Sequence, residues 1–379
     1  MRSMRAAIGL AKVVSICVAV SVSAGAFVLP RAASAGDIPA FAVDPSWPKQ
    51  LPNNWIIGQV GGITVDGQGH IWVIHRPRSL SDDEMGATLT PPRSKCCAPA
   101  PPVLEFDVDG NLLRAWGGPG DGYEWVGREH GIEVDDRGFV WIGGNADNDN
   151  AILKFTVDGK YVAQIGRIAP RTDSNDTSQL GRPAETAIDK DANEIYVADG
   201  YGNRRIIVFD ATTLAYKRHW GAYGHPPNDD KQPPYDPKVP VQQQFGNPVH
   251  CVKIADDGLI YVCDRTQNRI QIFKKDGTFL KEWFFEKATL GNGAVWDLAI
   301  WPDPKQTYLL NADGENNEIR IIKREDGSVV GSFGHSGRNA GQFHWIHAMA
   351  VDKLGNVYTG EVDNAKRIQK FRLTSDALK

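Results

Sequence analysis

The sequence predicts an all-β fold, a six-bladed β-propeller closed by an N-terminal strand. Two observations predict this fold class. Short segments alternate apolar and polar residues with a period of two and are separated by Gly-containing turns, which is typical of antiparallel strands. A unit of four such segments also recurs six times, at intervals of roughly 40 to 70 residues, and units of this kind are propeller blades.

Each copy of the repeat contains a first strand, a turn with Asp and Gly, a second strand, a variable loop, and then a third and a fourth strand. The first strands of the six copies open near Gly62, His130, Ala184, Val249, Trp296 and Ile346. The sixth copy ends after its third strand, so residues 40–44 are expected to supply the missing fourth strand. This closure would leave no unpaired sheet edge, whereas an open array of blades would leave two.

The N-terminal segment has the features of a cleaved signal peptide. Two arginines within the first five residues precede an apolar stretch at 13–28, and the triplet Ala-Ser-Ala at 33–35 fits a signal peptidase site. The alternative is an uncleaved membrane anchor, but the apolar run is short for a span of about 20 residues. We therefore expect a signal peptide at 1–35, a single propeller domain at 36–379, and a periplasmic or secreted protein without membrane contact after cleavage.

The charge balance argues against a nucleic-acid partner. The 379 residues contain 42 Lys and Arg against 46 Asp and Glu, which gives a formal net charge of -4 at pH 7. A nucleic-acid binder usually carries a strongly basic surface. The partner must therefore be inferred from local features of the sequence.

Four cysteines follow the expected signal peptide. Cys251 and Cys263 flank a turn and can face one another across a hairpin, so a disulfide is one option for them. The adjacent Cys96 and Cys97 can form a vicinal pair or bond elsewhere, and the sequence leaves the pairing open. The C-x-x-C spacing of many zinc and redox sites is absent.

Histidine occupies one repeat position in alternate blades. The residues five positions before the end of each first strand are Gly61, His130, Ala184, His250, Trp296 and His347. Alternate blades of a six-bladed ring lie about 120° apart and their first strands line the channel, so the three imidazoles should converge on the axis. Three His ligands with an open fourth position are typical of catalytic zinc. The alternative is a metal-free polar plug, and the other histidines of the chain lack this phasing.

Two arginines and a tyrosine should lie at the same mouth of the channel. Arg76 and Arg265 follow second strands at one repeat position, and Tyr201 lies in the corresponding loop of the third copy. Arginine beside a metal ion suits binding of a carboxylate or of an oxyanion. Nearby positive charge also favours the ionised form of a tyrosine, which could then serve as a base. The alternatives are rim salt bridges and a packed loop aromatic.

Three long insertions should project from this same face. They are Ser79–Pro102, Arg167–Pro183 and Ala222–Pro248. Long loops gathered over one mouth are frequent sites of binding and catalysis. The insertions are therefore candidates to contribute to the site, and the alternative is that they are merely tolerated.

Segments spread over most of the chain carry a resemblance to a known family. They are IGQVGGITVD leading into IHR at 74–76, HGIEVD at His130, ADGYGNRRI from Ala198, VH at His250 with DRTQNRIQ from Asp264, and IH at His347 with GNVYTGE from Gly355. Through these segments the chain resembles peptidyl-α-hydroxyglycine α-amidating lyase, the lyase domain of peptidylglycine amidating enzymes. The resemblance implies a six-bladed propeller of NHL-repeat type with a three-His zinc site.

The resemblance also implies residue roles and a reaction. The implied roles are zinc ligands for His130, His250 and His347, a catalytic tyrosine for Tyr201, and substrate-binding and second active-site arginines for Arg76 and Arg265. The reaction splits a carbinolamide, R-CO-NH-CH(OH)-COOH, into an amide and glyoxylate. Zinc polarises the hydroxyl, the tyrosine takes a proton and the arginines stabilise charge. The expected partner is therefore a small-molecule or peptide-like substrate with a carboxylate.

Three features depart from the family. An Asp after the third zinc His helps to hold a structural calcium ion in the family, but this chain has Ala348 there, so calcium is a weaker expectation than zinc. A cysteine of the family's tyrosine loop is Gly202 here, and the insertion at 79–102 could give the mouth a different substrate. The alternatives are a related zinc hydrolase acting on another small molecule, and a non-catalytic NHL-repeat propeller that binds a protein, peptide or glycan.

Overall fold

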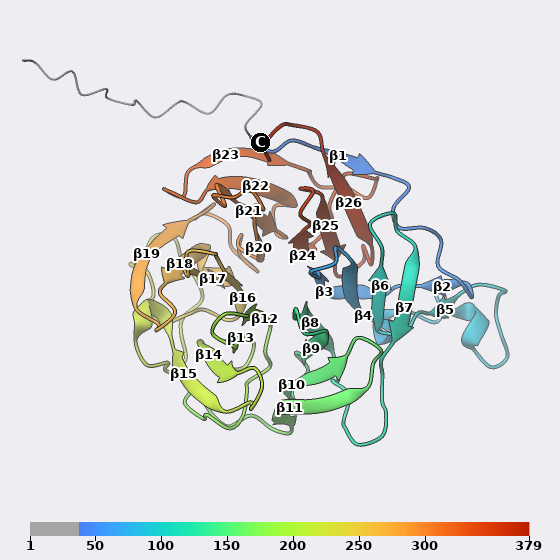
Figure 1. Ribbon diagram of the computed structural model, residues 1–379, viewed down its shortest axis with the longest axis horizontal. Coiled ribbons are helices and arrows are strands. Elements are labelled where there is room, and N and C mark those ends of the chain that lie inside the picture. Colours follow the sequence, from blue (N-terminus) through green and yellow to red (C-terminus); the bar gives the residue numbers. More distant parts are fainter. Residues whose placement is uncertain (1–37, 379) are drawn as a thin grey trace, which may run out of the picture.

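Six four-stranded antiparallel sheets are arranged radially around a central channel (Figure 1). The computed structural model describes residues 38–378, so the expected signal peptide at 1–35 lies outside the described residues. The innermost strands are β3 (Gln59–Val65), β8 (Glu129–Val134), β12 (Glu185–Asp189), β16 (Val249–Ile254), β20 (Asp297–Ile300) and β24 (Ile346–Val351). This arrangement is the predicted all-β, six-bladed propeller.

The other strands follow outward in chain order within each blade. The second strands are β4 (Ile71–Arg76), β9 (Phe139–Gly144), β13 (Glu194–Asp199), β17 (Ile260–Asp264), β21 (Tyr308–Asp313) and β25 (Val357–Glu361). The third strands are β6 (Val103–Phe106), β10 (Asp149–Thr156), β14 (Arg205–Asp210), β18 (Arg269–Phe273), β22 (Glu318–Lys323) and β26 (Ile368–Leu373). The fourth strands are β7 (Leu112–Trp116), β11 (Tyr161–Ile168), β15 (Tyr216–Trp220), β19 (Phe279–Phe284), β23 (Val329–Phe333) and β1 (Phe41–Asp44).

The N-terminal strand closes the ring, as predicted. β1 pairs antiparallel with β26, and Phe41 lies opposite Leu373. The Phe41 ring also packs against Phe333 of blade five at 4.4 Å between centroids and against Trp301 at 5.9 Å. The sixth blade is therefore completed by a strand from the opposite end of the chain, which removes an exposed sheet edge.

A repeated aspartate explains why the inner hairpins turn where they do. Asp135 Oδ1 accepts the N–H groups of Arg137 and Phe139, and its Oδ2 accepts Trp141 Nε1–H at 3.1 Å. Asp side chains stabilise such turns by bonding the backbone two residues on. Equivalent aspartate to aromatic contacts join Asp66 to Trp72 and Asp352 to Tyr358. The motif that recurs in the sequence is therefore a hairpin whose turn is stabilised by hydrogen bonds to its own aspartate.

The apolar core lies between neighbouring blades. One cluster joins Trp72, Ile74 and Val103 of blade one to Val140 and Phe155 of blade two, and all five side chains are buried. Burying a large apolar side chain contributes about 1.5 to 3 kcal/mol. Each blade thus stabilises the next, and the inner strands are held at fixed positions around the channel.

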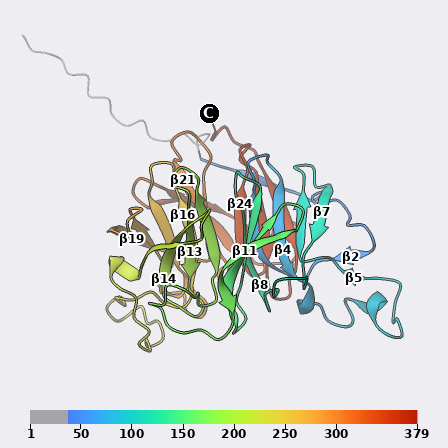
Figure 2. The ribbon, with the colours of Figure 1, turned by 60° about the horizontal axis from the view of Figure 1, so that its bottom comes forward.

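The insertions and cysteines add detail outside the blades. Beside blade one, β5 (Ala98–Pro99) pairs parallel with β2 (Trp55–Ile56) at the rim of the disc (Figures 1 and 2). The 3-10 turns are η1 (Pro77–Ser79), η2 (Gly86–Thr88), η3 (Ala222–Gly224) and η4 (Arg265–Gln267). Cys251 is bonded to Cys263 directly across β16 and β17, and Cys96 is bonded to Cys97. Within residues 38–378, the helices are all too short to cross a membrane.

Candidate metal centre

Three histidine side chains meet in the central channel. His130, His250 and His347 are the second residues of β8, β16 and β24, the innermost strands of alternate blades. The ring centroids are 5.2 Å apart for His130 and His250, 4.7 Å for His130 and His347, and 4.9 Å for His250 and His347. One ligand nitrogen from each lies within 4.8 Å of the others, and all three side chains are buried. The structure therefore brings the predicted residues together as a candidate metal site.

A β-bulge accompanies each histidine. In β16 and β24 the pairing register skips the histidine itself, so His250 and His347 have no partner residue on the second strand. In β8 the register shift falls between His130 and Ile132. A bulge bends the strand and re-aims a side chain. The regular alternation of apolar and polar residues in the sequence did not predict these β-bulges.

Carbonyl groups of the intervening blades orient two of the imidazoles. His130 Nδ1 lies 2.7 Å from the Ala184 oxygen, and His250 Nδ1 lies 2.5 Å from the Trp296 oxygen. Because a carbonyl only accepts, each Nδ1 carries the proton and each Nε2 keeps its lone pair. His347 Nδ1 is buried without a hydrogen-bond partner among residues 38–378. A neutral imidazole fixed through its other nitrogen is the usual form of a metal ligand.

Burial also keeps the imidazoles neutral. Desolvation lowers the pKa of His130, His250 and His347 well below 6.5, and the positive charges of Arg76 and Arg265 lower these pKa values further. A histidine must be unprotonated to bind a metal, so the lone pairs are available at neutral pH. Imidazole ligands suit zinc, copper, iron and nickel, and the donor set therefore fits a transition-metal ion.

The hydroxyl of Tyr201 lies beside the histidines. Its oxygen is 3.0 Å from Nε2 of His130 and 3.0 Å from Nε2 of His250. Arg265 Nη1 donates to the same oxygen at 3.2 Å, and the Arg265 guanidinium carbon lies 4.4 Å from the centre of the Trp296 ring. The tyrosine oxygen therefore lies where two imidazole lone pairs and a guanidinium converge.

Arg76 is the last residue of β4, and its side chain reaches the cavity beside the histidines from blade one. Its Nε donates to the Glu129 carbonyl at 2.8 Å and its Nη1 to Gln59 Oε1 at 2.9 Å. Burial, with repulsion from Arg128, lowers the Arg76 pKa to about 10. Within the described chain, the hydrogen bonds of Arg76 and Arg265 go to carbonyl, amide and hydroxyl oxygens and not to a carboxylate. Two buried guanidinium groups without a carboxylate partner form a site for an anion.

Buried ion pairs close the two loops that carry Tyr201 and Arg265. The pairs are Asp199 with Arg205 at 2.9 Å and Asp264 with Arg269 at 2.8 Å, and all four side chains are fully buried. The Tyr201 loop is also tightly packed at the next residue, because a Cβ on Gly202 would come within 2.8 Å of the Gly181 oxygen. The position where the resemblance suggests a cysteine therefore has no room for a side chain.

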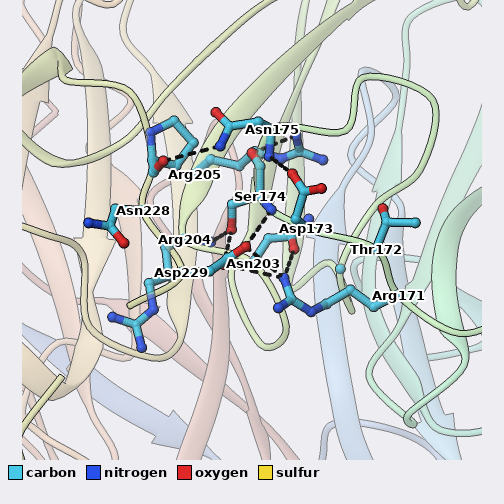
Figure 3. Close-up of polar contacts among 12 residues, drawn as sticks. Arg171, Thr172, Asp173, Ser174, Asn175, Asn203, Arg204, Arg205, Asn228 and Asp229 are labelled. Carbon is cyan, nitrogen blue, oxygen red and sulfur yellow. Dashed lines mark hydrogen bonds and ion pairs between the residues drawn. The ribbon is translucent and has the colours of Figure 1, made fainter. Parts of the chain in front are cut away.

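Two of the inserted segments buttress the Tyr201 loop through a polar network, here called the brace (Figure 3). Ser174 donates to Asp229 through its backbone N–H at 2.8 Å and its hydroxyl at 2.6 Å. The same hydroxyl accepts the Arg204 N–H at 3.1 Å, while Arg171 donates to Asn203 at 2.5 Å and to Asp229 at 3.3 Å. The brace thus ties two long insertions to the loop that positions the tyrosine.

A cavity of about 340 Å³ opens beside the histidines. It is lined by the predicted residues Arg76, Tyr201, Arg265 and His347, and also by Gln59, Arg128, Asn145, Asn292, Trp296, Trp345, Val362 and Asp363. These additional residues were not predicted from the sequence. Most of them flank the start of an inner strand or the end of a second strand, and Trp296 shares the repeat position of the histidines. Proximity to those strand ends is the sequence signal that could have found them.

The three long insertions do not line this cavity. The cavity lining contains no residue of the three insertions. The segment at 79–102 folds at the rim of blade one, and the other two support the Tyr201 loop without reaching the cavity. Short connections form the wall instead, because the propeller brings the ends of inner and second strands to the channel.

His75 and His70, two histidines without the repeat phase, lie outside the cluster of His130, His250 and His347. Fully buried His75 accepts the Gly58 N–H through Nδ1 at 3.1 Å, and its Nε2 contacts the Pro101 oxygen at 3.0 Å. Desolvation lowers its pKa to about 4. His70 contacts Glu105 on the outer part of blade one. Neither side chain belongs to the candidate metal site.

Comparison with known proteins identifies distant relatives. The chain is 27% identical over 346 residues to NHL repeat-containing protein 3 from Mus musculus. The aligned region covers 88% of this chain and 84% of that protein. It is 26% identical over 334 residues to a probable peptidyl-alpha-hydroxyglycine alpha-amidating lyase from Caenorhabditis elegans, covering 84% and 83%. The chain is a homologue of both. These relatives confirm the resemblance seen in the sequence, although no protein-family model matches the chain.

The homology extends to larger proteins, and the fold to a solved structure. Peptidyl-glycine alpha-amidating monooxygenase B from Xenopus laevis is 23% identical over 335 residues, but the chain spans only 35% of its length. A structural genomics protein of unknown function from Bacteroides thetaiotaomicron superposes with a TM-score of 0.53 at 15% identity, covering 84% of this chain and 70% of that one. The solved structure bears on the fold alone.

Proposed function

We propose that this protein is a zinc-dependent lyase that cleaves an N-acyl-α-hydroxyglycine into an amide and glyoxylate. The observation that carries the proposal is a cluster of three neutral imidazoles, two of which contact the hydroxyl of Tyr201, beside a cavity lined by Tyr201 and by two guanidinium groups without carboxylate partners. Homology to amidating lyases supports the same class of reaction.

The zinc ion would be held by His130, His250 and His347 through one ring nitrogen each. Three histidines with an open fourth position are a known ligand set of catalytic zinc, and the neutral state of the rings suits this role. When bound, zinc supplies Lewis-acid polarisation of a substrate oxygen.

Arg76 and Arg265 would bind the substrate carboxylate. Both guanidinium groups border the cavity, and they lie on opposite sides of it, in blades one and four. Charge-assisted hydrogen bonds from arginine to a carboxylate are among the stronger polar interactions in proteins. The rings of Trp296 and Trp345, whose centroids are 5.6 Å apart, offer an apolar wall for the acyl group. The proposed substrate is therefore small or peptide-like and ends in a carboxylate.

Tyr201 would move the proton. Its oxygen, acting in the ionised form, takes the proton of the substrate hydroxyl, and the electron pair left behind forms the aldehyde C=O of glyoxylate. The C–N bond breaks, and the nitrogen takes a proton and leaves as the amide. These steps balance without water, oxidant or reductant. Arg265, which donates to the Tyr201 oxygen at 3.2 Å, stabilises negative charge on that atom.

The proposal includes a location in the periplasm or outside the cell. The sequence of residues 1–35 fits a signal peptide. The disulfides Cys251–Cys263 and Cys96–Cys97 support an oxidising compartment, because such bonds rarely persist in the cytosol.

Glyoxylate release from N-benzoyl-α-hydroxyglycine tests this function. The zinc-loaded protein should release benzamide and glyoxylate in equal amounts faster than the spontaneous reaction. Replacing Arg76 with Ala should lower kcat/KM by about 100-fold, since a charge-assisted hydrogen bond is lost. The matched control is Arg338→Ala, an exposed arginine away from the cavity. If the zinc-loaded protein does not exceed the spontaneous rate, the lyase proposal is wrong, and a zinc hydrolase or a binding propeller takes its place.

A further inference from the structure

A second polar layer lies in the channel next to the histidines. A small cavity is lined both by the three histidines and by Glu185, Asp297 and Ala348. Lys253 Nζ contacts the Glu185 carboxylate and lies 3.1 Å from Asp297 Oδ1. A third carboxylate, Glu133, is bonded by the Thr64 hydroxyl at 3.0 Å. We call Glu133, Glu185, Lys253 and Asp297 the carboxylate layer.

Backbone N–H groups complete the hydrogen bonding of the two carboxylates that contact Lys253. Glu185 Oε2 accepts the N–H of Val252 at 2.9 Å. Asp297 accepts the N–H groups of Leu298 and Met349, both at 2.7 Å. These contacts fix the carboxylates on either side of the lysine ammonium, on blades three and five, while Lys253 itself belongs to blade four.

Potential ligand atoms cluster beside this layer as they do in a metal site, but the side chains do not supply a complete set of ligands. Glu185, Cys251 and Asp297 have potential ligand atoms within 4.8 Å of one another. The Cys251 sulfur is bonded to Cys263 and offers no thiolate. Ala348, where the resembled family has a calcium-binding Asp, offers no oxygen from its side chain. The calcium ion therefore does not fit the residues of this channel.

We infer that Lys253 is the built-in cation of the carboxylate layer, and that its ammonium group replaces a divalent metal ion there. The carboxylates of Glu185 and Asp297, whose side chains are 17% and 5% exposed, repel unless a cation lies between them. Lys253 supplies this cation from within the chain. The layer should consequently be complete without calcium, and removing the ammonium should create a site for calcium, since carboxylate oxygens are the ligands that calcium prefers.

Calcium titration of the wild type and of Lys253→Ala tests the inference. Zinc-loaded proteins are passed through calcium-free buffer, and binding is followed by calorimetry and by thermal unfolding. The wild type should bind no calcium and keep the same Tm with or without millimolar calcium chloride. The variant should have a lower Tm, and calcium should raise it again while binding at about one ion per chain. Calcium binding by the wild type with a rise in Tm, or a folded variant that ignores calcium, would overturn the inference.

Lys154→Ala is the matched control. Lys154 is a buried lysine, less exposed than Lys253, and its Nζ donates to the Ala211 carbonyl at 3.0 Å and lies over the Trp141 ring, with no carboxylate contact in the described chain. This variant should lose stability that calcium does not restore. Restoration by calcium there would mean that the ion acts elsewhere, which would contradict the inference.

A charge-free variant covers the case in which Lys253→Ala does not fold. In Lys253→Met with Glu185→Gln and Asp297→Asn, both the cation and its two partners lose their charge together. This triple variant should fold, should have a higher Tm than Lys253→Ala or fold where that variant does not, and should not bind calcium. A triple variant as unstable as the single one would show that charge neutralisation is not the role of Lys253.

Discussion

His130, His250 and His347, here called the histidine layer, lie next to the carboxylate layer in the same channel. The two layers differ in the source of their positive charge. His130, His250 and His347 are neutral and present lone pairs, so an added cation would be bound from solution. The carboxylate layer already contains the ammonium group of Lys253 between two carboxylates. The inner strands of one fold can thus bind a cation from solution at one level of the channel and supply a cation as a lysine side chain at the next level. The choice depends on a few residues at adjacent repeat positions.

The two layers also respond to pH in opposite senses. Burial lowers the pKa values of the histidines, so the stability they contribute is present above pH 6.5 and is lost as pH falls. Burial raises the pKa of Glu133 to about 7. Its contribution is present at low pH and is lost as pH rises through this value. Four substitutions test this comparison, from the largest expected effect to the smallest.

Replacing His250 with Ala should have the largest effect. Only two imidazoles remain, so the zinc ion should be lost on dialysis and glyoxylate release should fall more than roughly 1,000-fold. Zinc content is measured by inductively coupled plasma mass spectrometry and activity by glyoxylate assay. The exposed His335→Ala serves as the control. Retention of one zinc per chain by His250→Ala would contradict the ligand assignment.

Tyr201→Phe should separate proton transfer from metal binding. The ring remains but the oxygen beside His130 and His250 is removed, so kcat should fall about 100-fold to 10,000-fold while zinc content stays unchanged. Tyr235→Phe, whose hydroxyl donates to the Lys287 carbonyl away from the cavity, is the control. An unchanged kcat would show that another group takes the proton.

Glu133→Gln should change the pH dependence of stability. The folded-state pKa of about 7 exceeds the ordinary value of 4.5, so folding favours the protonated form of Glu133. Its contribution is lost as pH rises through 7, by about 3 kcal/mol in total. The variant should therefore gain stability relative to the wild type between pH 5 and pH 8, measured by urea unfolding. Exposed Glu124→Gln is the control, and identical pH slopes for Glu133→Gln and the wild type would refute the prediction.

Ser174→Ala tests the brace and should have the smallest effect. It removes the hydroxyl that joins Asp229 to the backbone of Arg204, so the Tyr201 loop becomes less rigid. We expect kcat to fall about 10-fold, which corresponds to about 1.4 kcal/mol, with KM and zinc content unchanged. Thr172→Ala lies in the same insertion but contacts Asp176 instead, and it should leave kcat unchanged. Equal losses in both variants would assign the effect to the insertion as a whole.

The sequence was sufficient for the blades and for the convergence of the histidines. His130, His250 and His347 share one repeat position, and a closed six-bladed ring places that position at one level of the channel. The closing strand at Phe41–Asp44 was predictable because the sixth copy lacked a fourth strand. Residues at the same position of each repeat lie at the same level around the channel. These features can therefore be predicted without knowledge of side-chain contacts.

Contacts between different blades could not be predicted in the same way. The carbonyl of Trp296 orients His250 across 46 residues of sequence, and Lys253 reaches Glu185 across 68. Such pairings depend on bulges and rotamers that the alternation of a strand does not encode. The role of the long insertions could not be predicted for a related reason, since length alone does not tell whether a loop lines a cavity or supports its wall.

The metal content of the wild-type protein tests the central comparison most directly. The protein is incubated with an excess of zinc and calcium, separated from free ions by gel filtration, and measured by mass spectrometry. The account predicts one zinc and no calcium per chain. Absence of zinc would contradict the recruitment of a metal by the histidine layer, and stoichiometric calcium would contradict the role of Lys253 as the cation of the carboxylate layer.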